Sequence, residues 1–167
     1  MKRLFVLLVG MIVGLGLMVS PAAASNGQKV LTFHTMAPVS GPFVGSTNPI
    51  RGINGGGLPW QIDAGKGHLS TSGKLEVRVR GLVLLEAAPV PEALQGTNPI
   101  ANFQAVVSCL TPADGSVTTV NVATAPFPAT TSGDAKTTAN LDLPSPCFAP
   151  IVFVGPSATA WFATTGL

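Results

Sequence analysis

Tyrosine is absent from this sequence, and tryptophan, histidine and cysteine occur only twice each. Charged residues make up only 10% of the 167 positions. Carbohydrate-binding grooves are commonly lined by exposed aromatic rings, so the shortage of rings disfavours a groove of that kind. The histidines and carboxylates are few and scattered, which gives no pattern typical of an acid–base site.

Motifs that would signal a defined chemistry are also missing. The sequence has no CxxC pair, no HExxH zinc motif, no GxSxG nucleophile setting and no P-loop. No helix start follows the glycines at positions 55–57, so the dinucleotide-binding fingerprint is absent as well. We therefore expect no cofactor and no metal, and the sequence favours a protein without catalytic activity.

No apolar run has the roughly 20 residues that a membrane-spanning helix needs. The run from Leu4 to Val19 is shorter, follows Lys2 and Arg3, and precedes the small residues SPAAA. This is the layout of a secretory signal peptide, with an uncleaved anchor as the alternative. We predict cleavage after Ala24, a signal peptide at residues 1–24, a β-sandwich domain at residues 25–167, and secretion to the extracellular space or cell surface.

Cleavage would also remove the net charge of +2, because the predicted leader contains two basic residues and no acidic one. A neutral chain gives no reason to expect a basic patch that neutralises phosphates, so we expect no nucleic-acid partner. Neutral protein surfaces associate readily, which leaves a homo-oligomer open as an alternative.

The two cysteines, Cys109 and Cys147, both lie beyond the predicted leader. An even pair in an exported chain predicts a disulfide, and closing so long a loop would stabilise the fold by about 4 kcal/mol. A thiol nucleophile or metal ligand is disfavoured, because no histidine lies near either cysteine in the sequence.

The stretch GHLSTSGKLEVRVRGLVLL, residues 67–85, predicts a β-hairpin followed by one long strand. Ser72-Gly73 would form the turn. Apolar and charged residues alternate up to Arg80, which places Leu75, Val77 and Val79 on one face and Lys74, Glu76, Arg78 and Arg80 on the other. After Gly81 both faces are apolar, so a Pro-rich segment, another strand or a second protomer must cover that half.

Further strands are expected along the rest of the chain. They lie at residues 30–36, 58–63, 102–110, 116–124, 138–143, 151–154 and 160–164, with a possible single helical turn at 91–95. Eight or nine short strands separated by turns predict an all-β fold, a β-sandwich first and a β-barrel second. The expected inward residues are Leu75, Val77, Val79, Phe103, Val107, Leu141, Ile151 and Phe153.

The stretch RGINGGGLPW, residues 51–60, is the strongest candidate for a binding site. Its glycine amides could hold an anion with help from Arg51, and Arg51, Asn54 and Trp60 could contact a glycan or peptide. The alternative is a loop that needs positive φ angles where it crosses a sheet edge.

The two histidines give a second candidate site. His68 lies near Lys66 and Asp63 in the sequence, so it joins the candidate ligand-binding residues. A small secreted hydrolase that uses His68 or His34 is the enzymatic alternative, whereas ordinary exposed strand residues are the structural one.

The segments RGINGGGLPW, GKLEVRVRGLVL, GTNPIANFQAVVSCL, APFPAT and LPSPCFAPIVFV resemble a group of small exported bacterial proteins without an assigned activity. The resemblance covers most of the chain after the leader and implies no catalytic or binding residue. We expect a secreted, disulfide-stabilised β-sandwich that acts as a binding or structural module, with a glycan or protein as its unknown ligand. A self-assembling surface protein, joined through the apolar half of the long strand, is the third alternative.

Overall fold

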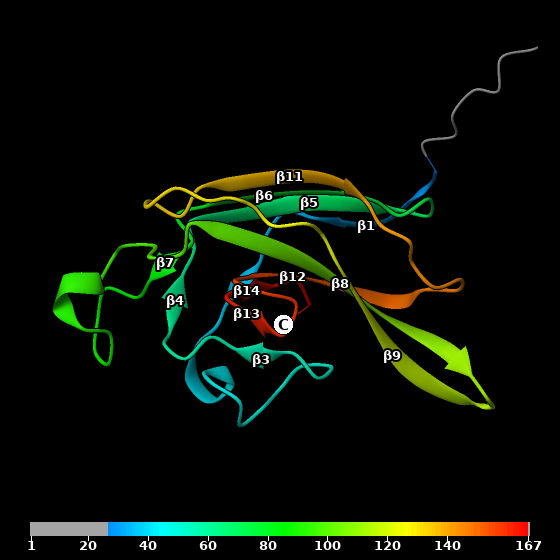
Figure 1. The fold of residues 1–167 in the computed structure, drawn as a ribbon, viewed down its shortest axis with the longest axis horizontal. Helices are drawn as coiled ribbons and strands as arrows, with labels where there is room; N and C mark the ends of the chain where they lie inside the picture. The colour runs from blue at the N-terminus through cyan, green and yellow to red at the C-terminus, as the bar shows by residue number, and fades with distance from the viewer. Residues whose placement is uncertain (1–26, 167) are drawn as a thin grey trace, which may run out of the picture.

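Two antiparallel sheets stack face to face in the computed structural model, which describes residues 27–166 (Figure 1). The first sheet has the order β1-β5-β6-β11, formed by Lys29–Phe33, Ala64–Ser70, Lys74–Arg80 and Ala135–Asn140. The second has the order β10-β8-β12-β14-β2, formed by Phe127–Pro128, Asn102–Ala113, Phe148–Gly155, Ala163–Thr164 and Ala37–Pro38. The predicted β-sandwich is therefore confirmed, whereas the predicted signal peptide lies outside the described residues.

Short elements complete the fold. Strand β9 (Ser116–Ala123) extends the second sheet by pairing with β8, while β3 (Asn54–Gly55) pairs with β13 (Ala160–Trp161) and β4 (Trp60–Gln61) with β7 (Val83–Leu84). Two 3-10 turns, η1 (Gly41–Phe43) and η2 (Glu92–Leu94), lie in connections. No helix within residues 27–166 is long and apolar enough to cross a membrane.

The hairpin of β5 and β6 forms the centre of the first sheet, as the alternating pattern predicts. Gly73 adopts φ 78° in the turn, a conformation that glycine enters without steric cost. Leu75, Val77 and Val79 are buried, and the charged side of β6 faces away from the core. Strand β11 pairs with the other edge of β6.

The prediction of one unbroken strand to Leu85 is wrong. Strand β6 ends at Arg80, because Gly81 adopts φ 60° and turns the chain out of the sheet. The following residues pair with β4 instead, and both Leu82 and Leu84 are buried by the chain itself, at 0% and 3% exposure. The apolar run is thus covered within one molecule, which removes the surface proposed for self-assembly.

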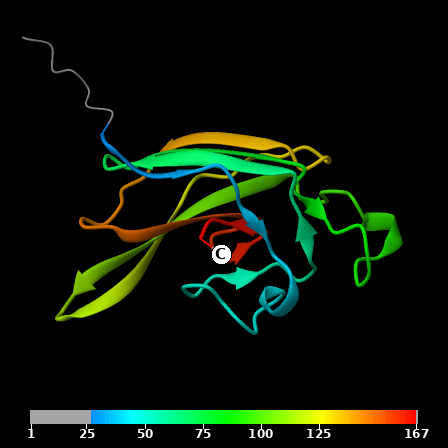
Figure 2. The ribbon, with the colours of Figure 1, turned by 180° about the vertical axis from the view of Figure 1, so that it is seen from behind.

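Strand β8 is the longest strand and is covered on both faces. Its inward residues Phe103, Ala105, Val107 and Cys109 face the first sheet, but Val106 and Ser108 on the opposite side are equally buried. Both views show η1 and β3 on the far side of the second sheet (Figure 1 and Figure 2). The connection between β2 and β4 therefore acts as a third layer over the second sheet.

The predicted disulfide is confirmed. Cys109 in β8 is bonded to Cys147, which precedes β12, with the two Cα atoms 4.9 Å apart. Cys109 is fully buried, so the bridge ties the centre of the core to the start of β12.

Several strand boundaries differ from expectation. The strand predicted at residues 138–143 is β11, which begins earlier and ends at Asn140, so Leu141 is only half-buried. Ile151 is also half-buried, beside a register shift in β12. Strand β8 continues through Pro112 to Ala113, and the end of its hairpin with β9 projects away from the body of the sandwich (Figure 2).

Candidate functional site

Nearly all cationic side chains of the described residues gather on the first sheet. Between residues 27 and 166, every lysine and arginine except Arg51 lies on β1, β5, β6 or β11, whereas Glu76 is the only acidic residue in these four strands. The inward positions of the strands are apolar, so alternation sends the charged residues to the outer face. A net charge near zero therefore does not exclude a basic patch, contrary to our expectation, because the acidic residues lie elsewhere in the chain.

Strand pairing aligns three of these cations into one row, here called the cationic row. Lys66 of β5 pairs directly with Arg78 of β6, and Arg78 pairs with Lys136 of β11. All three side chains are exposed. None of them forms an ion pair within residues 27–166, where the ion pairs join Glu76 to His68 and to Lys74. Like charges placed directly opposite each other destabilise a sheet.

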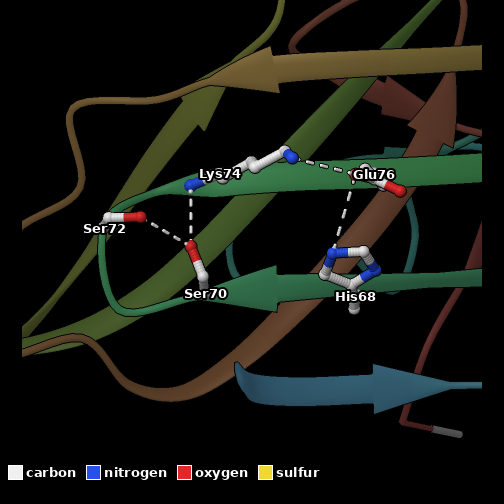
Figure 3. Close-up of polar contacts among 5 residues, drawn as sticks. All are labelled: His68, Ser70, Ser72, Lys74 and Glu76. Atoms are coloured by element: carbon white, nitrogen blue, oxygen red, sulfur yellow. Dashed lines mark hydrogen bonds and ion pairs between the residues drawn. The ribbon is translucent and has the colours of Figure 1, made fainter. Parts of the chain in front are cut away.

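A second row, here called the polar row, lies beside the first. Thr32 of β1 pairs with His68, His68 with Glu76, and Glu76 with Thr138 of β11. Figure 3 shows Glu76 between His68 and Lys74: its carboxylate lies 3.8 Å from His68 Nε2 and 3.2 Å from Lys74 Nζ. The two rows line a shallow groove of about 400 Å³, which also contacts Lys29 and His34.

The environment of His68 does not resemble a hydrolase site. The His68 side chain contacts Glu76 (Figure 3). The nearby Ser70 hydroxyl is hydrogen-bonded to the Ser72 hydroxyl at 2.8 Å, and it accepts a hydrogen bond from the backbone N–H of Lys74 at 3.1 Å. A nucleophilic serine needs a base within hydrogen-bond reach. The other histidine, His34, is exposed. No group of three or more His, Cys, Asp or Glu residues in the described part of the chain is placed to hold a metal ion.

Arg51 lies away from the cationic face and has a structural contact. Its guanidinium donates hydrogen bonds to the carbonyl oxygens of Ser108, at 2.9 Å, and Ala149, at 2.8 Å. These carbonyls lie where the pairing of β12 with β8 shifts register, which leaves ladder groups without a strand partner. Burial lowers the pKa of the Arg51 guanidinium from its ordinary value. Arg51 therefore holds the third layer against the irregular part of the second sheet.

We expect Arg51→Ala to lower the free energy of unfolding by about 1–3 kcal/mol, because two carbonyls lose a charged donor. Arg51→Lys should recover only part of this, since a single ammonium lacks the planar fork that spans two acceptors. Urea unfolding followed by circular dichroism measures both. Arg80→Ala is the control: Arg80 is exposed and forms no ion pair among residues 27–166, so a change beyond about 0.5 kcal/mol is not expected. An Arg51→Ala variant as stable as the parent would contradict this role.

The glycine-rich stretch is packed inside the fold. The amides of Gly55 and Gly56 donate to the carbonyls of Gly45 and Trp161, at 3.0 and 2.8 Å, so they are engaged. Trp60 is only 3% exposed, and its ring stacks on Phe162 with centroids 3.7 Å apart. Asn54 is half-buried in β3, where its backbone N–H donates a hydrogen bond to the carbonyl of Thr159.

The four candidate binding residues are therefore not brought together. His68 lies in the groove of the first sheet, whereas Arg51, Asn54 and Trp60 lie in the third layer and at β4. The sequence did not predict the cationic row, because Lys136 lies far along the chain from the β5–β6 hairpin and only the pairing of β11 with β6 brings it beside Arg78. The alternation of Lys74, Glu76, Arg78 and Arg80 in β6 was the only local signal of it.

No family model matches this chain, and no curated protein or solved structure matches it either. The resemblance to small exported bacterial proteins thus stays a prediction.

Proposed function

We propose that this protein is a secreted binding module that holds an anionic ligand on the outer face of its first sheet. The cationic row carries the proposal: Lys66, Arg78 and Lys136 stand opposite one another without a carboxylate partner in the described chain. Such a row costs stability, and departures from local rules without a compensating contact are typical of functional sites. An anion lying across the row would supply the missing countercharge.

The shape of the face supports the same proposal. Within residues 27–166, no segment crosses over the outer face of the first sheet in either view (Figure 1 and Figure 2). The groove spans all four strands and is lined by long, flexible side chains. Such side chains adapt to a ligand, and the rigid sheet beneath them sets their spacing.

A secreted destination is part of the proposal. Disulfides form and persist in oxidising compartments, and the Cys109–Cys147 bridge fits such a compartment. Together with the predicted leader, this favours a ligand found outside the cell or at its surface.

The test uses dextran sulfate as a polyanion and unmodified dextran as its neutral counterpart. We expect the protein to bind dextran sulfate but not dextran, with an affinity that falls as salt rises. Changing Lys66, Arg78 and Lys136 together to Gln should weaken binding roughly threefold to hundredfold, because each of the three lost ion pairs contributes about 0.2–1 kcal/mol. The same variant should be slightly more stable, since the repulsion is relieved.

A matched control lowers the net charge by as much as the triple Gln variant does, but at positions outside the first sheet. Ser116, Thr118 and Thr119 are exposed on β9, and replacing all three by Glu lowers the net charge by the same amount. This variant should keep most of the affinity for dextran sulfate. If both triple variants lose affinity equally, or if the parent does not bind, the cationic face is not a binding site.

A further inference from the structure

The two rows of the groove differ in chemistry, and the difference indicates a ligand class. The cationic row offers charges only, whereas the polar row offers two hydroxyls, an imidazole and one carboxylate. We propose that the ligand is a linear acidic polysaccharide whose sugar carboxylates meet the cationic row and whose hydroxyls meet the polar row. This inference rests on the proposed function of the first sheet.

The spacing of the cationic row fits a polymer that crosses the strands. Neighbouring strands lie about 4.8 Å apart, so Lys66, Arg78 and Lys136 repeat at that interval across β5, β6 and β11. One sugar unit advances a polysaccharide chain by a comparable length. Carboxylates on the side of the polysaccharide that faces the sheet can therefore meet cations of this row, while the carboxylates on the other side stay in solvent.

The distance between the two rows also fits a sugar chain. Arg78 and Glu76 are two residues apart on β6, as are Lys66 and His68 on β5. Two residues of a strand span about 7 Å, which is the scale of a sugar ring with its substituents. A ring lying across the groove would thus reach one row with its carboxylate and the other with its hydroxyls.

Glu76 is the residue that discriminates between polyanions. It is the only carboxylate on the four strands, and its side chain keeps 42% of its accessible surface. A carboxylate accepts hydrogen bonds from sugar hydroxyls but repels phosphates. A polymer that carries charge along its whole backbone, such as polyphosphate, meets this repulsion, whereas a sugar presents hydroxyls at the same place.

The face lacks the features of a nucleic-acid site. Neither a nucleic-acid base nor a sugar ring can stack on the groove, because the one phenylalanine that lines it, Phe33, is only 7% exposed. A sugar acid can still be held there by ion pairs and by hydroxyl contacts, which need no aromatic ring.

The test compares four polymers with the intact protein at one salt concentration: polygalacturonate, its fully methyl-esterified form, polyphosphate and single-stranded DNA. We expect polygalacturonate to bind roughly tenfold or more tightly than the other three, measured by calorimetry. Glu76→Gln should strengthen polyphosphate binding more than polygalacturonate binding and so reduce the preference several-fold. Glu92→Gln, an exposed carboxylate in η2, is the matched control and should leave the preference unchanged.

The outcomes separate this inference from the proposed function. If polyphosphate or DNA binds as tightly as polygalacturonate, or if Glu76→Gln leaves the preference intact, the polysaccharide inference is overturned while the anion-binding module stands. If the methyl ester binds as tightly as the acid, or if no polymer binds, both proposals fail. Melting temperatures of the two Glu variants, expected to match the parent, exclude a folding defect.

Discussion

Replacing Cys109 and Cys147 together by Ala is expected to lower the free energy of unfolding by about 2–5 kcal/mol. The bridge closes a sequence separation of 38 residues, for which loop closure predicts about 4 kcal/mol. The loss is large because Cys109 is buried at the centre of β8, whereas Cys147 anchors the chain that enters β12. Urea unfolding of the variant and the parent, followed by tryptophan fluorescence, measures the difference.

Reduction of the parent supplies the control for this prediction. The reduced parent should unfold at a urea concentration close to that of the double variant, because both lack the same constraint on the unfolded chain. The double variant is preferred to either single change, since a single change leaves a free thiol. Equal stability of the variant and the oxidised parent would show that the bridge does not stabilise the sandwich.

Trp60→Ala is expected to cost about 3–5 kcal/mol of stability, the range for removing a buried large aromatic side chain. The Trp60 ring stacks on Phe162, and it meets Phe103 edge-on with centroids 6.5 Å apart. Phe103 and Phe162 also pack against each other, so the three rings form one cluster. Removing one ring leaves a cavity between the other two, which thermal unfolding will detect as a lower melting temperature.

Phe148→Ala is the matched aromatic control, because Phe148 is 54% exposed. Its effect should stay within about 0.5 kcal/mol. Trp60→Phe should retain part of the ring packing and should therefore lose less stability than Trp60→Ala. If Trp60→Ala left stability unchanged but weakened binding to a glycan or peptide, the tryptophan would be a ligand contact and not a core residue.

The alternation of residue types along β6 was sufficient to predict which side chains are inside. Leu75, Val77 and Val79 are buried as expected, because side chains of a strand point to opposite faces in turn. The same rule was less accurate at strand ends. Leu141 follows the last residue of β11, and Ile151 lies beside the register shift in β12, so neither is held inside a regular ladder.

The break at Gly81 could not be predicted from the apolar run around it. Leu82, Val83 and Leu84 are buried whether the chain continues the sheet or turns away, so their hydrophobicity does not distinguish the two paths. The turned path is selected by distant partners: the Leu82 amide donates to the carbonyl of Gly133, and Leu84 pairs with Trp60. Both contacts depend on segments far from Gly81 in the chain.

The candidate site shows the same division. The alternation of residue types along β6 was enough to predict that Glu76 and Arg78 face outward. The disulfide was also predictable from the sequence, because the chain has only one pair of cysteines. Tertiary structure alone placed Lys136 beside Arg78, since the pairing of β11 with β6 is long-range and a shift by one residue would send the side chain to the opposite face. Lys66 meets Arg78 within the β5–β6 hairpin, where the turn sets the register. Tertiary structure also decided the contacts of Arg51 and Trp60, which the sequence had suggested as ligand contacts. Arg51 donates to carbonyls of the second sheet, and Trp60 stacks on Phe162, all of them distant in the chain.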